Sequence, residues 1–242
     1  MSTSSEARSG VAARRVDLIP SVEPAPRFFW LHLKKCGGMS FRKTFSPPYV
    51  ETDRTRPPRP FSEVPRAEWN DCVNNYRVEL GEYDYRRMLF VRDRLYSPAE
   101  FDAMYKFAFS RNPYDRVLSA WRFLYRKRWY HPLRYSFPRF LRALPSIWAT
   151  KSDRHVATHT APIWPDVADD DGRLLLDDLF HLEEIDRATP ILNERLGTNV
   201  DGLAHTNRMS SASDYRAAYT TETRRLVEQL YAEDLERLAY RF

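Results

Sequence analysis

The segment Arg27–Leu33 (RFFWLHL) runs directly into Lys34–Ser40 (KKCGGMS), and this junction decides the fold that the sequence predicts. The first stretch is apolar and aromatic, which is typical of a buried strand. A helix can begin at Phe41–Phe45. In such a strand, loop and helix, successive backbone N–H groups point inward and the helix start adds partial positive charge. The junction therefore predicts an anion-binding loop, which Gly37 and Gly38 let an anion approach closely.

Two side chains of this loop also suit an anion. Lys35 supplies a mobile positive charge, and Ser40 supplies a hydroxyl donor. The loop differs from an ordinary Walker A loop, because its lysine precedes the glycines rather than following them. Taken alone, the same residues also fit a Gly-Gly turn with two solvated lysines.

Strands and helices are expected to alternate along the rest of the chain. The expected strands are Arg87–Val91, Lys106–Ser110 and Leu179–Leu182; the expected helices start at Ser97 and Asn112 or span Glu184–Leu196 and Thr220–Tyr231. The alternation predicts an α/β fold: a single P-loop-like domain with a central, mostly parallel sheet flanked by helices. The domain should span 27–242, residues 1–26 should form a flexible tail, and the proline-rich stretch 46–66 should be a surface loop.

Composition narrows the class of protein. The chain has 242 residues, of which 14% are aromatic, so it is not of a disordered type. Its apolar runs are too short to span a membrane and its first residues lack a signal-peptide pattern, so we expect a cytoplasmic protein without a membrane span. Cys36 and Cys72 are expected to be free thiols. No Cys/His spacing resembles a zinc site, so no metal is expected.

The net charge of +5 has a local source. The segment 116–152 contains no Asp or Glu and interleaves Arg and Lys with aromatic residues. A helix with a solvated basic face explains part of this pattern, and contact with an anionic or sugar-bearing partner explains the rest. Nucleic acid is the weaker alternative, because it would explain neither the loop nor the motif described next.

The second motif is Arg111–Trp121 (RNPYDRVLSAW). Arg111 ends an expected strand, Asn112 is a good N-cap, and Ser119 lies two turns into the following helix. Taken alone, this is an ordinary capped helix with a solvated arginine.

Together the two motifs resemble the sulfotransferases that use 3′-phosphoadenosine 5′-phosphosulfate, particularly the carbohydrate type. Their loop H-x-P-K-T-G-G-T-S is similar to His32–Ser40, and their R-[DN]-P-Y-x-R-x-x-S-x-[YW] is matched by Arg111–Trp121. The end of the chain, Tyr231–Tyr240, looks like the family's closing Y-x-x-D-x-x-x-x-x-Y, and Leu182-Glu183 and Asn207 are similar too. The resemblance covers about residues 27–242, strongly at the two motifs and loosely elsewhere.

The resemblance implies a role for each matched residue. The backbone of Cys36–Ser40 would hold the 5′-phosphate, Lys35 would contact the bridging oxygen and the sulfuryl group, and Arg111 with Ser119 would bind the 3′-phosphate. This chain departs from the family pattern at three loop positions. Lys34 replaces a proline, and Cys36 and Met39 replace hydroxyl residues, so the loop has fewer side-chain donors to phosphate.

Transfer to a hydroxyl also needs a general base, which in the family usually lies between the two motifs. Here that interval has no histidine after His32. Asp93 lies there, but Arg92 and Arg94 on either side should lower its pKa and favour a salt bridge. His155 and His159 come later and are the other candidates, although a surface histidine is commoner than a catalytic one.

The sequence thus predicts a sulfotransferase acting on a hydroxyl or amine of a glycan or small molecule, with the phosphosulfate nucleotide as donor. Two alternatives stay open. The first is a kinase-like P-loop enzyme, which the missing Walker Lys-Ser pair disfavours. The second is a non-catalytic nucleotide- or polyanion-binding module on the same scaffold, which the uncertain base leaves open.

Overall fold

The computed structural model describes residues 18–44, 49–53, 55–126, 136–201 and 215–242. Its sheet is formed by β1 (Phe28–Leu31), β2 (Tyr105–Ser110) and β3 (Asp178–His181), in the order β1-β2-β3. All pairings are parallel, with Leu31 opposite Ala108 and Ser110 opposite His181. The expectation of an α/β fold with a parallel sheet is confirmed, although the described sheet is small.

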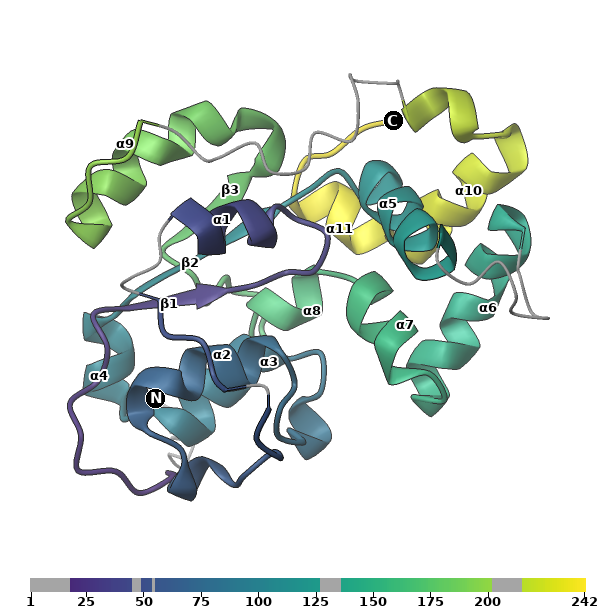
Figure 1. Cartoon of the computed structure of the whole chain (residues 1–242). Coiled ribbons are helices and arrows are strands. Elements are labelled where there is room, and N and C mark those ends of the chain that lie inside the picture. Colours follow the sequence, from purple (N-terminus) through teal and green to yellow (C-terminus); the bar gives the residue numbers. More distant parts are fainter. Residues whose placement is uncertain (1–17, 45–48, 54, 127–135, 202–214) are drawn as a thin grey trace, which may run out of the picture.

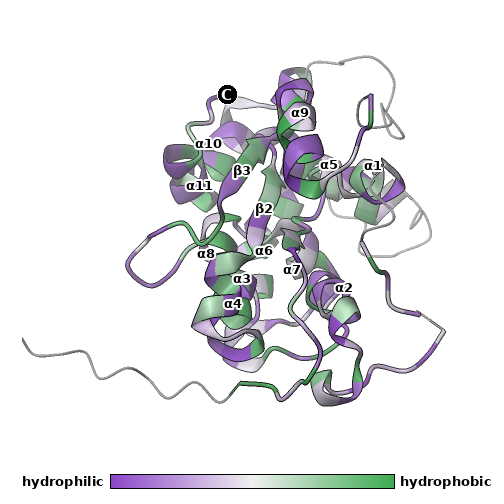
Figure 2. Cartoon of the chain, turned by 90° about the vertical axis from the view of Figure 1, so that its left-hand side faces the viewer, coloured by the Kyte–Doolittle hydropathy of each residue, from purple (hydrophilic) through white to green (hydrophobic). Residues whose placement is uncertain are grey.

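Helices surround the sheet, with α1 and α9 on one side of it and α2, α3 and α8 on the other (Figure 1). In Figure 2 the helices are striped, with hydrophobic residues on one side and hydrophilic residues on the other, as expected for helices that cover a core. The α-helices are α1 (Gly38–Thr44), α2 (Trp69–Asn74), α3 (Arg87–Phe90), α4 (Pro98–Ala103), α5 (Pro113–Arg126), α6 (Phe137–Thr150), α7 (Arg154–Thr160), α8 (Trp164–Val167), α9 (Ile185–Leu196), α10 (Thr221–Leu230) and α11 (Ala232–Arg237).

Two buried clusters form the core. The larger one packs the sheet against α1, α2, α8 and α9, with Phe29, Phe107 and Phe109 among its fully buried rings. The second lies among α5, α6, α7 and α10, and includes Leu118 and Phe140. Helix α5, which follows β2 directly, belongs to this second cluster while its first residues reach the end of the sheet. It therefore connects the sheet to the helical half of the molecule.

One strand prediction is wrong. The run Arg87–Val91 is not a strand: it forms α3 and leads into a π-helix, η4 (Val91–Leu95). Met88, Leu89, Phe90 and Val91 are all buried, and an apolar run buried on all sides fits a buried helix as well as a buried strand. The carboxylate of Asp166 favours the helix by accepting a hydrogen bond from the backbone N–H of Arg87, at 2.8 Å.

The helix starts and stops follow the sequence more closely. Ser97 caps α4 in a capping box with Glu100, Thr220 caps α10, and Gly197 ends α9 in the left-handed conformation. Pro190 lies inside α9 without dividing it. At the other end of the chain, Ile19 donates a backbone hydrogen bond to Arg94, so the described part of the expected tail contacts the domain.

Side chains from α2 cover the outer edge of β1. The Asn70 side chain accepts from the Trp30 N–H and donates to the Trp30 carbonyl oxygen, at 3.2 and 2.9 Å. The Asn74 side chain accepts from the His32 N–H at 2.7 Å and also donates to the Trp30 carbonyl oxygen at 2.8 Å. These amides satisfy backbone groups that a neighbouring strand would otherwise bind.

Candidate functional site

The two sequence motifs meet at one edge of the sheet. Because β1 and β2 are parallel, their carboxyl ends lie together, and the loop 34–40 is placed beside Arg111 and α5. Arg111 Nη1 donates to the carbonyl oxygen of Lys35 at 3.1 Å, and Arg116 Nε donates to that of Lys34 at 3.1 Å. Residues far apart in the sequence therefore form one site.

The backbone of the loop presents unpaired donors. Lys35 and Gly37 adopt positive φ angles of 67° and 80°, which turn the chain so that neighbouring N–H groups converge. The N–H groups of Ser40 and Phe41 bond the Gly37 carbonyl oxygen. Among the described residues, no acceptor bonds the N–H groups of Gly37, Gly38 or Met39. These three donors are available to an external anion.

Both glycines are required by close packing. A Cβ added to Gly38 would lie 1.8 Å from Nε2 of His32, because the ring of this buried histidine packs against the loop. A Cβ added to Gly37 would lie 2.6 Å from the Leu182 side chain, in addition to the cost of its positive φ. The sequence indicated the glycines, but not that side chains would pack against them.

The two lysines have different surroundings. Lys34 Nζ lies 3.2 Å from Nδ1 of His32 and 3.2 Å from the side-chain oxygen of Asn75, so it ties the loop to β1 and α2. Lys35 Nζ lies 4.3 Å from the centre of the Phe123 ring, a cation–π contact. Burial, and then the charge of Arg111, lower the pKa of Lys35. Lys35 is the lysine beside both Arg111 and an exposed aromatic ring.

The remaining loop side chains point in different directions. Cys36 is 1% exposed, its thiol faces the Lys34 carbonyl oxygen, and burial raises its pKa to about 11, so it is a neutral thiol. Cys72 is also buried, and both cysteines are free thiols. Met39 is 64% exposed, and Ser40 is half-buried. The thiol at 36 therefore does not face an anion bound by the loop amides.

One face of α5 borders the loop. Asp115 accepts two hydrogen bonds from Arg111, at 2.9 and 2.6 Å. Ser119 and Phe123 follow at successive spacings of four residues, so they lie on the same face as Asp115. Ser119 is half-buried and Phe123 is 50% exposed. The sequence prediction included Arg111 and Ser119 but missed Asp115 and Phe123, although their helical spacing was a usable signal.

The candidate bases are not all near the loop. Asp93 forms an ion pair with Arg92 at 2.7 Å, and among the described residues no hydrogen bond or ion pair joins either of them to the loop. His155 is exposed on α7, and its ring meets Phe123 edge-on with centroids 6.2 Å apart. The ring of His159, also on α7, stacks on Phe123 with centroids 5.1 Å apart. Of these three residues, the structure brings His159 closest to the loop through a shared ring.

A segment at the end of the chain holds the elements that carry the site in place through buried hydrogen bonds. We call residues 231–240 the closing segment. Asp234, 0% exposed, accepts hydrogen bonds from the backbone N–H groups of Ile163 and Trp164. Tyr240 Oη bonds Ser110 and Glu183, and Glu183 also accepts from the Asn112 N–H. The contacts of Tyr240 and Glu183 fix the ends of β2 and β3, where Arg111 precedes α5, and those of Asp234 hold the start of α8. The position matched to Asn207 lies outside the described residues.

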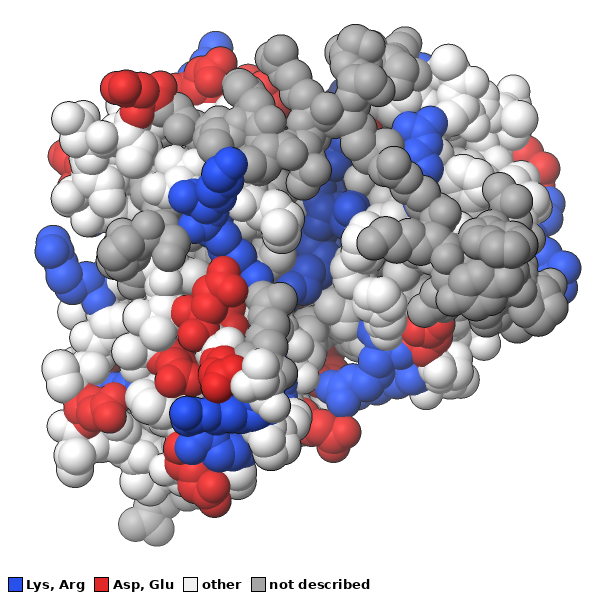
Figure 3. Space-filling model, in the orientation of Figure 1, with Lys and Arg blue, Asp and Glu red and all other residues white. Residues whose placement is uncertain are grey.

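Positive charge gathers near the site. Figure 3 shows Lys and Arg side chains in a hollow near the centre of this face, between α1 and α5. Of the predicted basic segment, 127–135 lies outside the described residues. Arg116 is 3% exposed beneath the loop, Arg142 pairs with Glu222, and Lys151 pairs with Asp84. These three cations are bonded within the protein.

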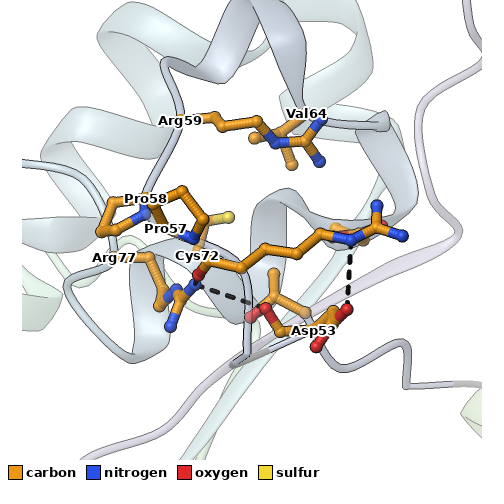
Figure 4. Close-up of a pocket in the computed structure, with 10 residues that line it drawn as sticks. Asp53, Pro57, Pro58, Arg59, Val64, Cys72 and Arg77 are labelled. Carbon is orange, nitrogen blue, oxygen red and sulfur yellow. Dashed lines mark hydrogen bonds and ion pairs between the residues drawn. The ribbon is translucent and has the colours of Figure 1, made fainter.

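A small cavity lies elsewhere, beside the proline-rich stretch. It has a volume of about 30 Å³ and is lined by residues that include Thr52, Val64 and Cys72. Figure 4 shows Arg59 and Arg77 around it. Such a volume holds about one water molecule, so the cavity cannot hold a nucleotide.

Comparison with known proteins finds no match: no family model, no curated protein and no solved structure matches this chain. Within the described ranges, no helix combines the length and apolar character needed to cross a membrane. The same residues contain no group of three or more His, Cys, Asp or Glu side chains arranged to hold a metal ion.

Proposed function

We propose that this chain is a sulfotransferase that moves the sulfuryl group of 3′-phosphoadenosine 5′-phosphosulfate to a hydroxyl or amine of a glycan or small molecule. The observation that carries the proposal is the meeting of the two motifs. Arg111, from the second motif, donates a hydrogen bond to the Lys35 carbonyl oxygen of the first. A nucleotide with phosphates at both its 5′ and 3′ positions would engage the two motifs together.

The loop supplies the groups that the 5′ end of this donor needs. The three available N–H groups of residues 37–39 would bind the 5′-phosphate. Lys35 would stabilise the charge that builds on the bridging oxygen as the S–O bond breaks. Its cation–π contact with Phe123 is weak enough, at about 1 kcal/mol, for an anion to replace it.

Arg111 would bind the 3′-phosphate together with Ser119. Its guanidinium now bonds Asp115, so that carboxylate would compete with the phosphate for the same donors. A phosphate makes more and stronger charge-assisted hydrogen bonds than one carboxylate oxygen. Asp115 would therefore orient Arg111 before the donor binds. It would also weaken the affinity of Arg111 for the 3′-phosphate without preventing that phosphate from binding.

Nucleotide binding is the first test. The bisphosphate product, 3′-phosphoadenosine 5′-phosphate, should raise the melting temperature, and AMP should raise it much less. Arg111→Ala should weaken bisphosphate binding by about ten- to a hundredfold, the loss of one or two charge-assisted hydrogen bonds. Asp115→Asn should tighten it, because the competing charge is removed. Stabilisation by ATP but not by the bisphosphate would overturn the proposal and favour a kinase-like enzyme.

Transfer is the second part of the same test. Lys35→Ala should abolish release of the bisphosphate from the phosphosulfate donor, with only a moderate change in product affinity. Lys43→Ala is the matched control, because Lys43 is an exposed lysine on α1. Undiminished turnover of Lys35→Ala would contradict the role assigned to Lys35 at the bridging oxygen. If the native chain binds the bisphosphate but transfers no sulfuryl group, it is a non-catalytic nucleotide-binding module.

A further inference from the structure

The Phe123 ring joins two groups from separate parts of the chain. Lys35 Nζ lies 4.3 Å from its centroid, and the His159 ring stacks on it at 5.1 Å with an interplanar angle of 25°. Phe123 is nonetheless 50% exposed. The proposed sulfuryl-contacting lysine and a histidine therefore contact the same half-exposed aromatic ring.

The hydrogen bonding of His159 fixes its tautomer. Nδ1 lies 2.8 Å from the backbone carbonyl oxygen of His155, and a carbonyl oxygen can only accept. Nδ1 therefore carries the hydrogen, and Nε2, on the far side of the ring, keeps its lone pair. A neutral imidazole held in this way can accept a proton at Nε2.

His32 is held in the opposite state. Its Nδ1 accepts from the Lys34 ammonium at 3.2 Å, so its Nε2 carries the hydrogen, and that nitrogen packs against Gly38. His32 therefore has no free lone pair. His155 accepts the Nδ1 hydrogen bond of His159 through its backbone carbonyl and packs its ring edge-on against the His159 ring at 4.6 Å, and Asp93 is paired with Arg92. The rings of His155 and His159 both contact Phe123, but His159 stacks on it at 5.1 Å whereas the exposed His155 meets it edge-on at 6.2 Å. His159 is also the residue whose Nδ1 hydrogen bond leaves Nε2 with its lone pair.

We propose that His159 Nε2 accepts the proton of the acceptor hydroxyl, and that Phe123 is the positioning residue that holds His159 beside Lys35. This inference rests on the proposed sulfotransferase function. In the step, the acceptor oxygen forms a bond to sulfur while the bond from sulfur to the bridging phosphate oxygen breaks. The hydroxyl proton moves to Nε2, the bisphosphate leaves with the bridging oxygen, and the imidazolium later loses its proton to water.

The charged groups around His159 support this role. They are His155 on the same helix, Lys34 and Lys35 on the loop, and His32 at the end of β1. Burial is the main cause that lowers the pKa of His159 to about 4, and His155, Lys34 and Lys35 lower it further. A bound nucleotide would bring negative charge to the two lysines. Its binding should therefore raise this pKa and make Nε2 a stronger base once the donor is in place.

Nuclear magnetic resonance of the whole chain with ¹⁵N-labelled histidine tests the proposal directly. The free protein should show His159 as the Nδ1–H tautomer with a pKa well below its ordinary value. Saturation with 3′-phosphoadenosine 5′-phosphate should raise this pKa by about one unit or more. An Nε2–H tautomer, or a pKa that does not move although the bisphosphate binds, would overturn the inference and leave the proposed function intact. Failure of the bisphosphate to bind would overturn both.

Matched variants provide a second, independent measurement. Bisphosphate release is followed with phenol as acceptor, or with water where phenol is not accepted. His159→Gln should lower kcat by about a hundredfold or more, keep bisphosphate affinity, and recover part of its rate with added imidazole. His155→Gln, which keeps the backbone carbonyl, should remain within about threefold of the native rate. A His159→Gln enzyme with native kcat and an unchanged pH profile would overturn the assignment.

Discussion

The loop 34–40 and the closing segment 231–240 both carry residues of the sulfotransferase-like pattern, yet their polar groups are used in opposite ways. In the loop, the N–H groups of Gly37, Gly38 and Met39 have no acceptor among the described residues. In the closing segment, Asp234 and the Tyr240 hydroxyl are bonded within the protein. The first region has polar groups to offer a ligand, and the second uses them to hold the sheet and α5 in place.

This difference separates two meanings of a shared motif. A residue can match a family pattern because it contacts the ligand, or because it supports the elements that do. Buried, fully bonded groups belong to the second kind, since they have no free donor or acceptor left. Substitutions in the closing segment should therefore affect stability, whereas those in the loop should affect binding as well.

Asp234→Ala should have the largest effect. It would leave the buried N–H groups of Ile163 and Trp164 without an acceptor and remove the negative charge beside Arg116. We expect the free energy of unfolding to fall by about 3–5 kcal/mol, measured by urea denaturation. Glu233→Ala, an exposed neighbour of the same charge, should cost less than about 0.5 kcal/mol. Equal losses of stability in Asp234→Ala and Glu233→Ala would contradict the supporting role given to the buried groups of the closing segment.

Gly38→Ala should come next. Its Cβ would overlap the His32 ring, so either the buried ring or the loop must move. We expect a loss of about 1–3 kcal/mol in stability, together with at least about tenfold weaker bisphosphate binding. Gly81→Ala tests a positive φ without crowding, since no atom of the described residues beyond its chain neighbours lies within 4 Å of its added Cβ. Gly81→Ala should lower the free energy of unfolding by about 1 kcal/mol and leave bisphosphate affinity unchanged. If Gly81→Ala also weakened bisphosphate binding, the weaker binding of Gly38→Ala could not be assigned to the loop.

Tyr240→Phe should have the smallest effect. It removes the hydroxyl that bonds Ser110 at 2.9 Å and Glu183 at 3.1 Å, which should cost about 1–1.5 kcal/mol without altering bisphosphate affinity. Tyr96→Phe is the matched control, because the buried Tyr96 hydroxyl has no hydrogen-bond partner within the part of the chain that the structure describes. Its removal should be neutral or slightly stabilising in thermal denaturation. Weaker binding in Tyr240→Phe would mean that the closing segment acts on the ligand as well as on stability.

The parts of the fold that depend on local signals could be predicted. The apolar run Arg27–Leu33 and the caps at Ser97 and Thr220 lie close to where strands and helices are found. The run Arg87–Val91 could not be resolved in the same way, because burial on every side removes the periodicity that separates helix from strand. Its helical state depends in part on Asp166, which lies far along the chain.

The candidate site was predictable to a similar degree. The loop and Arg111 were identified from residue spacing. The pairing of Arg111 with Asp115, four residues later in the first turn of α5, was missed although that spacing was a usable signal. The contact of His159 with Phe123 could not be foreseen, because it depends on how α5 and α7 pack. Nor could the packing of His32 on Gly38, which depends on the path of the loop between them.

The side-chain amides of Asn70 and Asn74 affect whether the sheet of this protein can pair with a strand of another chain. An exposed edge strand is a template on which another chain can add a strand, and this is a common route to aggregation. Along the outer edge of β1, the two side chains already occupy the Trp30 N–H and carbonyl groups and the His32 N–H. An incoming strand would have to displace both amides, so at this edge the sheet resists extension by another chain.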